Sequence, residues 1–206
     1  MRLLDISPPI GPQSPVFPGD TPFGLAWSWT LGPGCPVNVS TLTMSPHTGA
    51  HADAPLHYAA DGQAVGELPL APYIGPCRVI HAIGCGPLVR PEHVAHALHG
   101  LPPRVLLRTC RQAATAWDPA LTGLAPDTLE LLADAGVLLV GIDTASIDPA
   151  DSKDLPCHQI LLRRGLRVLE NLVLDDAPEG DCELIALPLR LVTADASPVR
   201  AVLRWD

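Results

Sequence analysis

Short apolar runs bounded by proline or glycine recur along the chain and predict β-strands. They are rich in valine, isoleucine, leucine and tryptophan, and they occupy residues 24–30, 37–44, 77–83, 105–108, 137–142, 168–174, 184–189 and 199–203. Because these eight runs outnumber the helical patterns, the sequence predicts a core built mainly from β-sheet.

Helical patterns are fewer and lie between the later strands. The strongest covers residues 127–135, where Asp127 is predicted to cap the first turn, Glu130 follows three residues later and Gly136 ends the helix. Two more are predicted over residues 91–99 and 157–163, each with a proline at or just before its start. The predicted fold class is therefore mixed α/β, with a closed or two-layer sheet and a few covering helices.

Length and composition indicate one folded domain over residues 1–206. Hydrophobic residues make up 47% of the chain and charged residues only 17%, which excludes intrinsic disorder. The chain has no internal repeat and no flexible linker that would divide it.

The distribution of charge excludes two classes of partner. Lysine and arginine number 13 against 22 acidic residues, and no basic cluster is present to bind nucleic acid. Residues 21–52 carry no Asp, Glu, Lys or Arg, but repeated prolines and glycines interrupt them, so no membrane span is predicted.

The N-terminus lacks the apolar region of a secretory signal, and six cysteines without a CxxC pair are interpreted as reduced thiols. A cytoplasmic location is therefore predicted.

The candidate chemistry lies in residues 45–58, SPHTGAHADAPLHY, which hold three histidines and one aspartate within eleven residues. His47 and His51 stand four apart, as in a helical zinc motif, but the prolines and glycine of this segment predict a loop that leaves a strand. In an extended segment, His51 and Asp53 point to the same side and can share a metal ion. The alternative is a set of polar loop residues whose imidazoles bind backbone groups.

Two further candidate ligands lie downstream. His158 is predicted in the first turn of a helix, and Glu170 stands within the apolar run 168–174. A carboxylate in such a strand requires a cation or a hydrogen-bonding partner, and a metal ion would meet that need. The alternative for Glu170 is an edge strand with the carboxylate facing water.

These residues together resemble the cyclase family of metal-dependent hydrolases. HTGAHADAPLHY matches the general motif HxGTHxDxPxH, and it is joined by the PGD sequence at residues 18–20 and by the distal His158 and Glu170. The similarity extends over essentially the whole chain. Ala50 replaces the motif's threonine, as in the bacterial formamidase branch of the family, to which the chain is more similar.

The resemblance implies a swivelling β/β/α cyclase-like fold, a homodimer, and a binuclear site that holds two divalent ions, usually Zn²⁺. It implies five metal ligands, with both carboxylates bridging: His47, His51, Asp53, His158 and Glu170. It assigns proton transfer to His57. The implied activity is hydrolysis of N-formyl-L-kynurenine to L-kynurenine and formate in tryptophan degradation.

The resemblance also implies a substrate-binding residue, because Phe17 stands where the formamidase branch more often has a tryptophan beside the substrate ring. Trp27, Trp29 and Tyr58 are further candidates for stacking on that ring, with a place in the core as the alternative for each.

Three other functions compete with this one. A cyclic amide hydrolase of the isatin hydrolase type would use the same metals. A non-haem iron oxygenase would use His51, Asp53 and His158 as a triad of two histidines and one carboxylate, which leaves His47, His57 and Glu170 unexplained. A metal-binding module without catalysis would bind ions and turn over no formyl anilide.

Overall fold

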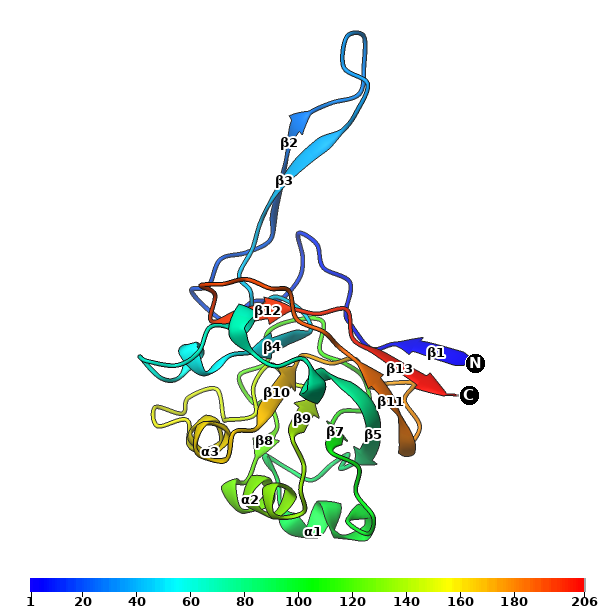
Figure 1. The fold of residues 1–206 in the computed structure, drawn as a ribbon, viewed down its shortest axis with the longest axis vertical. Helices are drawn as coiled ribbons and strands as arrows, with labels where there is room; N and C mark the ends of the chain where they lie inside the picture. The colour runs from blue at the N-terminus through cyan, green and yellow to red at the C-terminus, as the bar shows by residue number, and fades with distance from the viewer. Residues whose placement is uncertain (206) are drawn as a thin grey trace.

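The computed structural model describes residues 1–205, and nine of its strands form one curled sheet (Figure 1). Their order across the sheet is β1-β13-β11-β5-β7-β9-β10-β4-β12. In that order they span Arg2–Asp5, Val202–Trp205, Gly180–Ile185, Ile74–His81, Arg104–Arg108, Leu139–Ile142, Arg167–Glu170, His51–Asp53 and Ala196–Pro198. Two smaller pairs lie outside this sheet: β2 (Gly24–Trp29) with β3 (Val39–Thr43), and β6 (Leu88–Val89) with β8 (Gly123–Leu124).

The centre of the sheet is parallel, from β5 through β7 and β9 to β10, and its flanks are antiparallel. Parallel strands are buried on both faces, which explains the continuous apolar runs in the sequence. In β7, Leu107 packs on the side of the helices and Leu106 on the opposite side. In β9, a Cβ atom at Gly141 would lie 2.4 Å from the Leu106 side chain, so a larger residue there would force the buried Leu106 to shift.

Three helices cover one face of the sheet: α1 (Pro91–Val94), α2 (Pro126–Asp134) and α3 (Pro156–Arg164) (Figure 1). Each begins with proline, whose missing N–H is not needed in the first turn. Leu129 and Leu132 of α2 and Leu161 of α3 are fully buried against the parallel strands. The predicted mixed α/β class with a sheet-rich core is confirmed.

Two helix predictions need correction. Asp127 does not cap α2, because Ala125 occupies the capping position and Pro126 begins the helix. Asp127 therefore lies in the first turn, where its charge interacts favourably with the helix dipole. The helix predicted over residues 91–99 is shorter, since α1 ends at Val94 and a 3-10 turn follows over Ala95–Ala97.

The strand prediction missed five short elements: β1, β4, β6, β8 and β12. Strands of two to four residues are too short to show an alternating pattern. Three predicted strands were also displaced. β5 spans Ile74–His81 where residues 77–83 were predicted, β11 spans Gly180–Ile185 where residues 184–189 were predicted, and β13 spans Val202–Trp205 where residues 199–203 were predicted.

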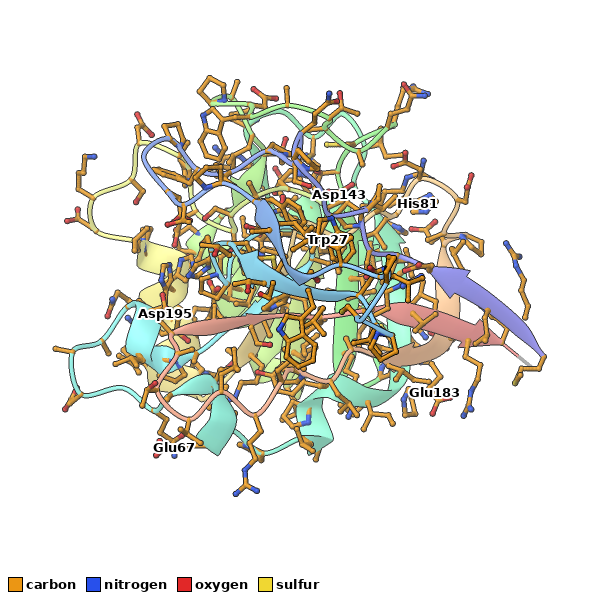
Figure 2. All side chains as sticks on the ribbon, turned by 90° about the horizontal axis from the view of Figure 1, so that it is seen from above. Trp27, Glu67, His81, Asp143, Glu183 and Asp195 are labelled. Carbon is orange, nitrogen blue, oxygen red and sulfur yellow. The ribbon has the colours of Figure 1, made fainter. Side chains whose placement is uncertain are left out.

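The β2–β3 hairpin projects away from the sheet (Figure 1), and Figure 2 looks down on it with Trp27 labelled. Trp27 is 59% exposed and Trp29 is 61% exposed. The alternative that these two tryptophans belong to the core is therefore wrong, and their stacking on a substrate stays a prediction.

No helix among residues 1–205 is long and apolar enough to cross a membrane. The single domain predicted over residues 1–206 includes Asp206, which lies outside the described residues. Both that domain assignment and the cytoplasmic location stay predictions.

Candidate metal centre

The candidate centre is built on β4, which lies between β10 and β12. The register places Glu170 of β10 opposite His51, and Ala196 of β12 opposite Asp53. His51 and Asp53 face the same side, as the alternation of an extended segment predicts. The sequence predicted a loop for this segment, which is correct for His47 and wrong for residues 51–53. Residues 51–53 form a strand because they pair with β10 and β12, which lie far along the chain.

Asp53 lies at the middle of the cluster, and its side chain is fully buried. Its Oδ1 atom lies 3.0 Å from Nδ1 of His47 and 3.4 Å from Nε2 of His51. Its Oδ2 atom lies 3.3 Å from Nε2 of His158. The two carboxylate oxygens thus face different histidines.

Glu170 completes the cluster from β10. Its Oε2 atom lies 3.4 Å from Nε2 of His51, and its Oε1 atom lies 3.7 Å from Nε2 of His158 and accepts the Ile147 N–H at 2.8 Å. The Glu170 residue is only 3% exposed, so the alternative of an edge-strand carboxylate facing water is wrong. His158 lies in the first turn of α3, as predicted.

Two buried atoms of the cluster have no hydrogen-bond partner among residues 1–205: Nε2 of His51 and Oδ1 of Asp53. The other ring nitrogen of His51, Nδ1, donates to the Gly49 carbonyl at 2.9 Å, which leaves the Nε2 lone pair free. Buried polar atoms without partners are costly, and a cation between these atoms would satisfy both. Imidazole and carboxylate donors suit zinc and related ions, so the residues fit a divalent metal.

The electrostatics of the cluster also favour a cation. Burial lowers the pKa of His51, but Asp53 and Glu170 outweigh that effect and raise it to about 10. His158 behaves in the same way, with burial opposed by Asp148 and Asp53, and its pKa rises to about 10. The carboxylates therefore attract positive charge, which protons supply when a metal does not.

Asp148 holds His158 in place, and sequence reasoning missed it. Its Oδ2 atom accepts from Nδ1 of His158 at 2.7 Å, which turns Nε2 toward Asp53. The same carboxylate accepts the backbone N–H groups of Cys157 at 2.9 Å and His158 at 3.1 Å, where α3 begins. Although burial opposes it, these hydrogen bonds hold the pKa of Asp148 below its usual range. Nothing in the sequence pattern linked this loop acid to a histidine ten residues later.

We expect Asp148→Asn to weaken metal binding by about 10- to 100-fold, which is typical when a carboxylate that orients a ligating histidine is lost. Competition with a chelating dye measures this affinity without reference to catalysis. Asp151→Asn, at an exposed acid three residues away, is the matched control and should leave the affinity unchanged. Equal affinities in Asp148→Asn and wild type would show that Asp148 does not orient a ligand.

His57 lies at the edge of the cluster, in the 3-10 turn Pro55–His57, and its side chain is 34% exposed. Its Nδ1 atom lies 3.3 Å from Oδ2 of Asp195, a second acid that sequence reasoning missed. Ligand atoms of Asp53, His57 and His158 lie within 4.8 Å of one another, so this geometry is compatible with metal binding by His57 as well as with proton transfer.

A cavity of about 450 Å³ opens above the cluster, and His47, His51, His57, His158 and Glu170 all line it. Phe17, the predicted substrate-binding residue, lines the same cavity. Its ring packs edge to face against Trp117, with centroids 4.8 Å apart, and Trp117 also lines the cavity although no pattern singled it out. Tyr58 instead packs against the His158 ring at 5.2 Å.

The curled sheet thus places a buried cluster of histidines and carboxylates beneath a cavity. The Cyclase family model matches residues 4–149, and the chain belongs to this family. It is 67% identical over 203 residues to kynurenine formamidase of Delftia acidovorans, covering 98% of this chain and 97% of that protein.

Solved structures share the fold. One described as a potential metal-dependent hydrolase with cyclase activity matches with a TM-score of 0.85 and 28% identity, covering 100% of this chain and 99% of the other. Isatin hydrolase A from Labrenzia aggregata matches with a TM-score of 0.82 and 24% identity, covering 98% and 93%, and at that identity only the fold is shared. The predicted cyclase-like fold is thereby confirmed.

Proposed function

We propose that the protein is a metal-dependent kynurenine formamidase, which hydrolyses N-formyl-L-kynurenine to L-kynurenine and formate. The observation that carries this proposal is the 67% identity to a kynurenine formamidase over 98% of the chain. Its support in the structure is a buried cluster of metal-binding side chains that opens onto a cavity large enough for a small aromatic substrate.

We assign two divalent ions, with zinc as the expected metal, to His47, His51, Asp53, His158 and Glu170. This assignment is supported by Asp53, whose two oxygens face different histidines and are placed to serve two ions. When bound, such ions provide a nucleophilic water at neutral pH and polarise the carbonyl that it attacks.

The protein's own groups move the proton and orient the substrate. His57 stands at the mouth of the cluster, where its imidazole takes a proton from the attacking water and returns it to the departing aryl nitrogen. Phe17 and Trp117 form an aromatic wall of the cavity, and we assign them the contact with the aryl ring of the substrate.

A direct comparison of substrates tests the proposed activity. The zinc-loaded protein should release formate and L-kynurenine from N-formyl-L-kynurenine, with kcat/KM well above that for isatin. Faster turnover of isatin would identify a cyclic amide hydrolase. Activity that disappears without oxygen would identify an oxygenase, and no turnover with a full metal content would leave only a binding module.

We also propose a homodimer in which the β2–β3 hairpin is a contact surface. An isolated two-stranded hairpin is only marginally stable in water, so this one needs a packing partner. It also exposes an apolar surface of the kind that marks a protein contact, formed by Leu25, Trp27, Trp29, Val39 and Leu42. The hairpin, residues 24–43, carries no Asp, Glu, Lys, Arg or His, so it offers nothing to an oppositely charged partner. A second copy of the chain, with an equally apolar hairpin, is the occupant that this surface suits.

Sedimentation of the double variant Trp27→Ser/Trp29→Ser tests the contact. The wild type should sediment as a dimer at twice the chain mass of 21.7 kDa, and the variant should dissociate at concentrations where the wild type does not. Leu70→Ser, at an exposed leucine outside the hairpin, should remain dimeric. A wild type that is monomeric, or a variant as dimeric as the wild type, would remove the hairpin from the interface.

A further inference from the structure

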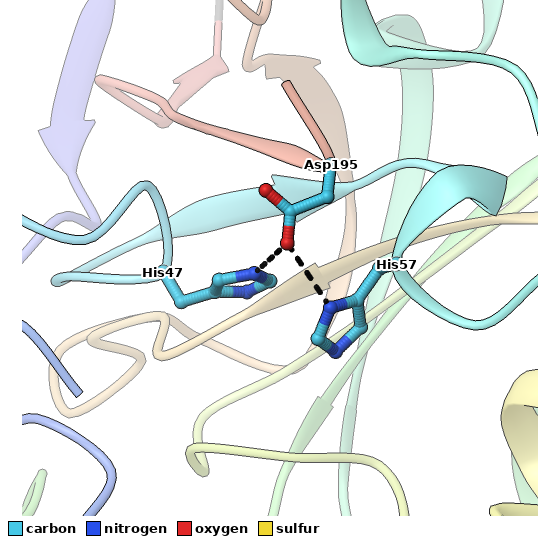
Figure 3. Close-up of side chains that lie close together, drawn as sticks. All are labelled: His47, His57 and Asp195. Carbon is cyan, nitrogen blue, oxygen red and sulfur yellow. Dashed lines mark hydrogen bonds and ion pairs between the residues drawn. The ribbon is translucent and has the colours of Figure 1, made fainter. Parts of the chain in front are cut away.

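One carboxylate oxygen links two histidines of the site. Oδ2 of Asp195 lies 3.0 Å from Nε2 of His47 and 3.3 Å from Nδ1 of His57, and Figure 3 shows it between the two rings. The imidazole centroids are 4.3 Å apart. The arrangement therefore joins a residue of the metal cluster to the residue assigned to proton transfer.

Backbone contacts hold these side chains in place. Asp195 immediately precedes β12, and its carbonyl oxygen accepts the Ala54 N–H at 2.8 Å, just beyond the end of β4. The His57 N–H in turn donates to the Ala54 carbonyl at 2.9 Å. Because the backbones of Asp195 and His57 are both hydrogen-bonded to Ala54, the distance between the two residues is fixed.

The hydrogen bonds also select the position of the proton on each ring. A carboxylate only accepts, so His57 must donate through Nδ1–H and His47 through Nε2–H. The lone pair of His57 is then on Nε2. The lone pair of His47 is on Nδ1, the atom that lies 3.0 Å from Oδ1 of Asp53.

We infer that Asp195 is a positioning residue, which fixes the tautomer and orientation of His57 for proton transfer and of His47 for metal binding. The inference rests on the proposed function. With Nδ1–H held by Asp195, Nε2 of His57 takes the proton of the attacking water and passes it to the departing nitrogen, while Asp195 stays ionised. Without Asp195, the His57 ring is free to rotate and its proton is free to move to Nε2. In that tautomer Nε2 has no lone pair with which to take a proton from the water.

Nuclear magnetic resonance of the histidine rings tests the inference without any substrate. In ¹⁵N-labelled, zinc-loaded wild type, the ring nitrogen shifts of neutral His57 should report the Nδ1–H tautomer. In Asp195→Ala they should move toward the Nε2–H tautomer that free imidazole favours. The ring of His99, an exposed histidine outside the site, should not change. A His57 tautomer that is the same in both proteins would overturn the inference even if the protein is a formamidase.

A double-mutant cycle tests the same role in catalysis. At saturating zinc, Asp195→Ala should lower kcat for N-formyl-L-kynurenine by about 10- to 100-fold with little change in KM. In the His57→Ala background, the same substitution should change kcat by no more than about twofold, because the residue through which it acts is already gone. Effects that multiply would show that Asp195 acts independently of His57 and would overturn its positioning role.

Metal analysis separates positioning from direct ligation, because His47, His57 and Asp195 also have the geometry of a metal-binding group. Asp195→Ala should keep the full number of ions at saturating zinc and bind them about 10- to 100-fold more weakly, through His47. Asp176→Ala, at an exposed acid outside the site, is the control and should match wild type. Loss of an ion at saturation would identify Asp195 as a ligand and overturn the inference.

If the wild type does not hydrolyse N-formyl-L-kynurenine, the proposed function fails and the double-mutant cycle of Asp195 and His57 cannot be measured. The ring-nitrogen spectra and the zinc affinities still decide whether Asp195 positions both histidines.

Discussion

Asp53→Ala should abolish binding of both metal ions and lower the rate of N-formyl-L-kynurenine hydrolysis by at least about 10³-fold. The reason is that Oδ1 of Asp53 faces His47 and His51, whereas Oδ2 faces His158. The variant therefore loses the one carboxylate that both sets of histidines share. Metal catalysis stabilises the transition state by several kcal/mol, and each 1.36 kcal/mol corresponds to a factor of ten in rate. Elemental analysis of the reloaded variant, together with its kcat, measures the effect.

A matched variant and a stability measurement keep this result interpretable. Asp61→Ala, at an exposed acid eight residues away, should retain both ions and full activity. Zinc should raise the Tm of the wild type, since a ligand that binds only the folded state stabilises it, and should leave the Tm of Asp53→Ala unchanged. Two ions retained in folded Asp53→Ala would rule out the shared role of its carboxylate.

His57→Ala should keep its metal and lose about 10²- to 10⁴-fold in kcat, the usual contribution of general acid-base catalysis. His57 lies at the exposed edge of the cluster, whereas His51 and His158 are buried within it. The loss should be smaller for an aryl formate with a good phenol leaving group, because a phenolate departs without protonation. Measuring both substrates with wild type and variant isolates the acid role.

His99→Ala serves as the control, since it removes an exposed imidazole that takes no part in the cluster. It should match wild type with both substrates. If His57→Ala loses metal as readily as His51→Ala, the residue is a ligand. Equal losses for the formamide and the formate ester would instead assign it to activation of the water.

The sequence predicted the fold class and the chemical groups of the site more fully than their arrangement. The parallel strands were found because burial on both faces leaves long apolar runs, as in β7. The three residues of β4 have no such pattern, because the strand exists only through its pairing with β10 and β12. Local periodicity cannot reveal an element whose partners lie more than 100 residues away.

The same distinction applies to the residues of the candidate site. His47, His51 and Asp53 were found because metal-binding side chains rarely cluster in so few residues. Asp148 and Asp195 were missed because each is a single acid in a loop, and each becomes significant only through the histidines that it contacts. Phe17 was named by resemblance, and its neighbour Trp117 is brought to the cavity by tertiary packing alone.

The position of β4 between β10 and β12 has a consequence for biosynthesis. The ribosome makes the segment His51–Asp53 early, but its two neighbours, Arg167–Glu170 and Ala196–Pro198, follow more than 100 residues later. Until those strands have been made, β4 has no partner, so the nascent chain carries His47, His51, Asp53 and His57 without the neighbours that assemble the site. Metal delivered at that stage would meet a flexible peptide, so we expect selective loading only after β10 and β12 have been made and have paired with β4.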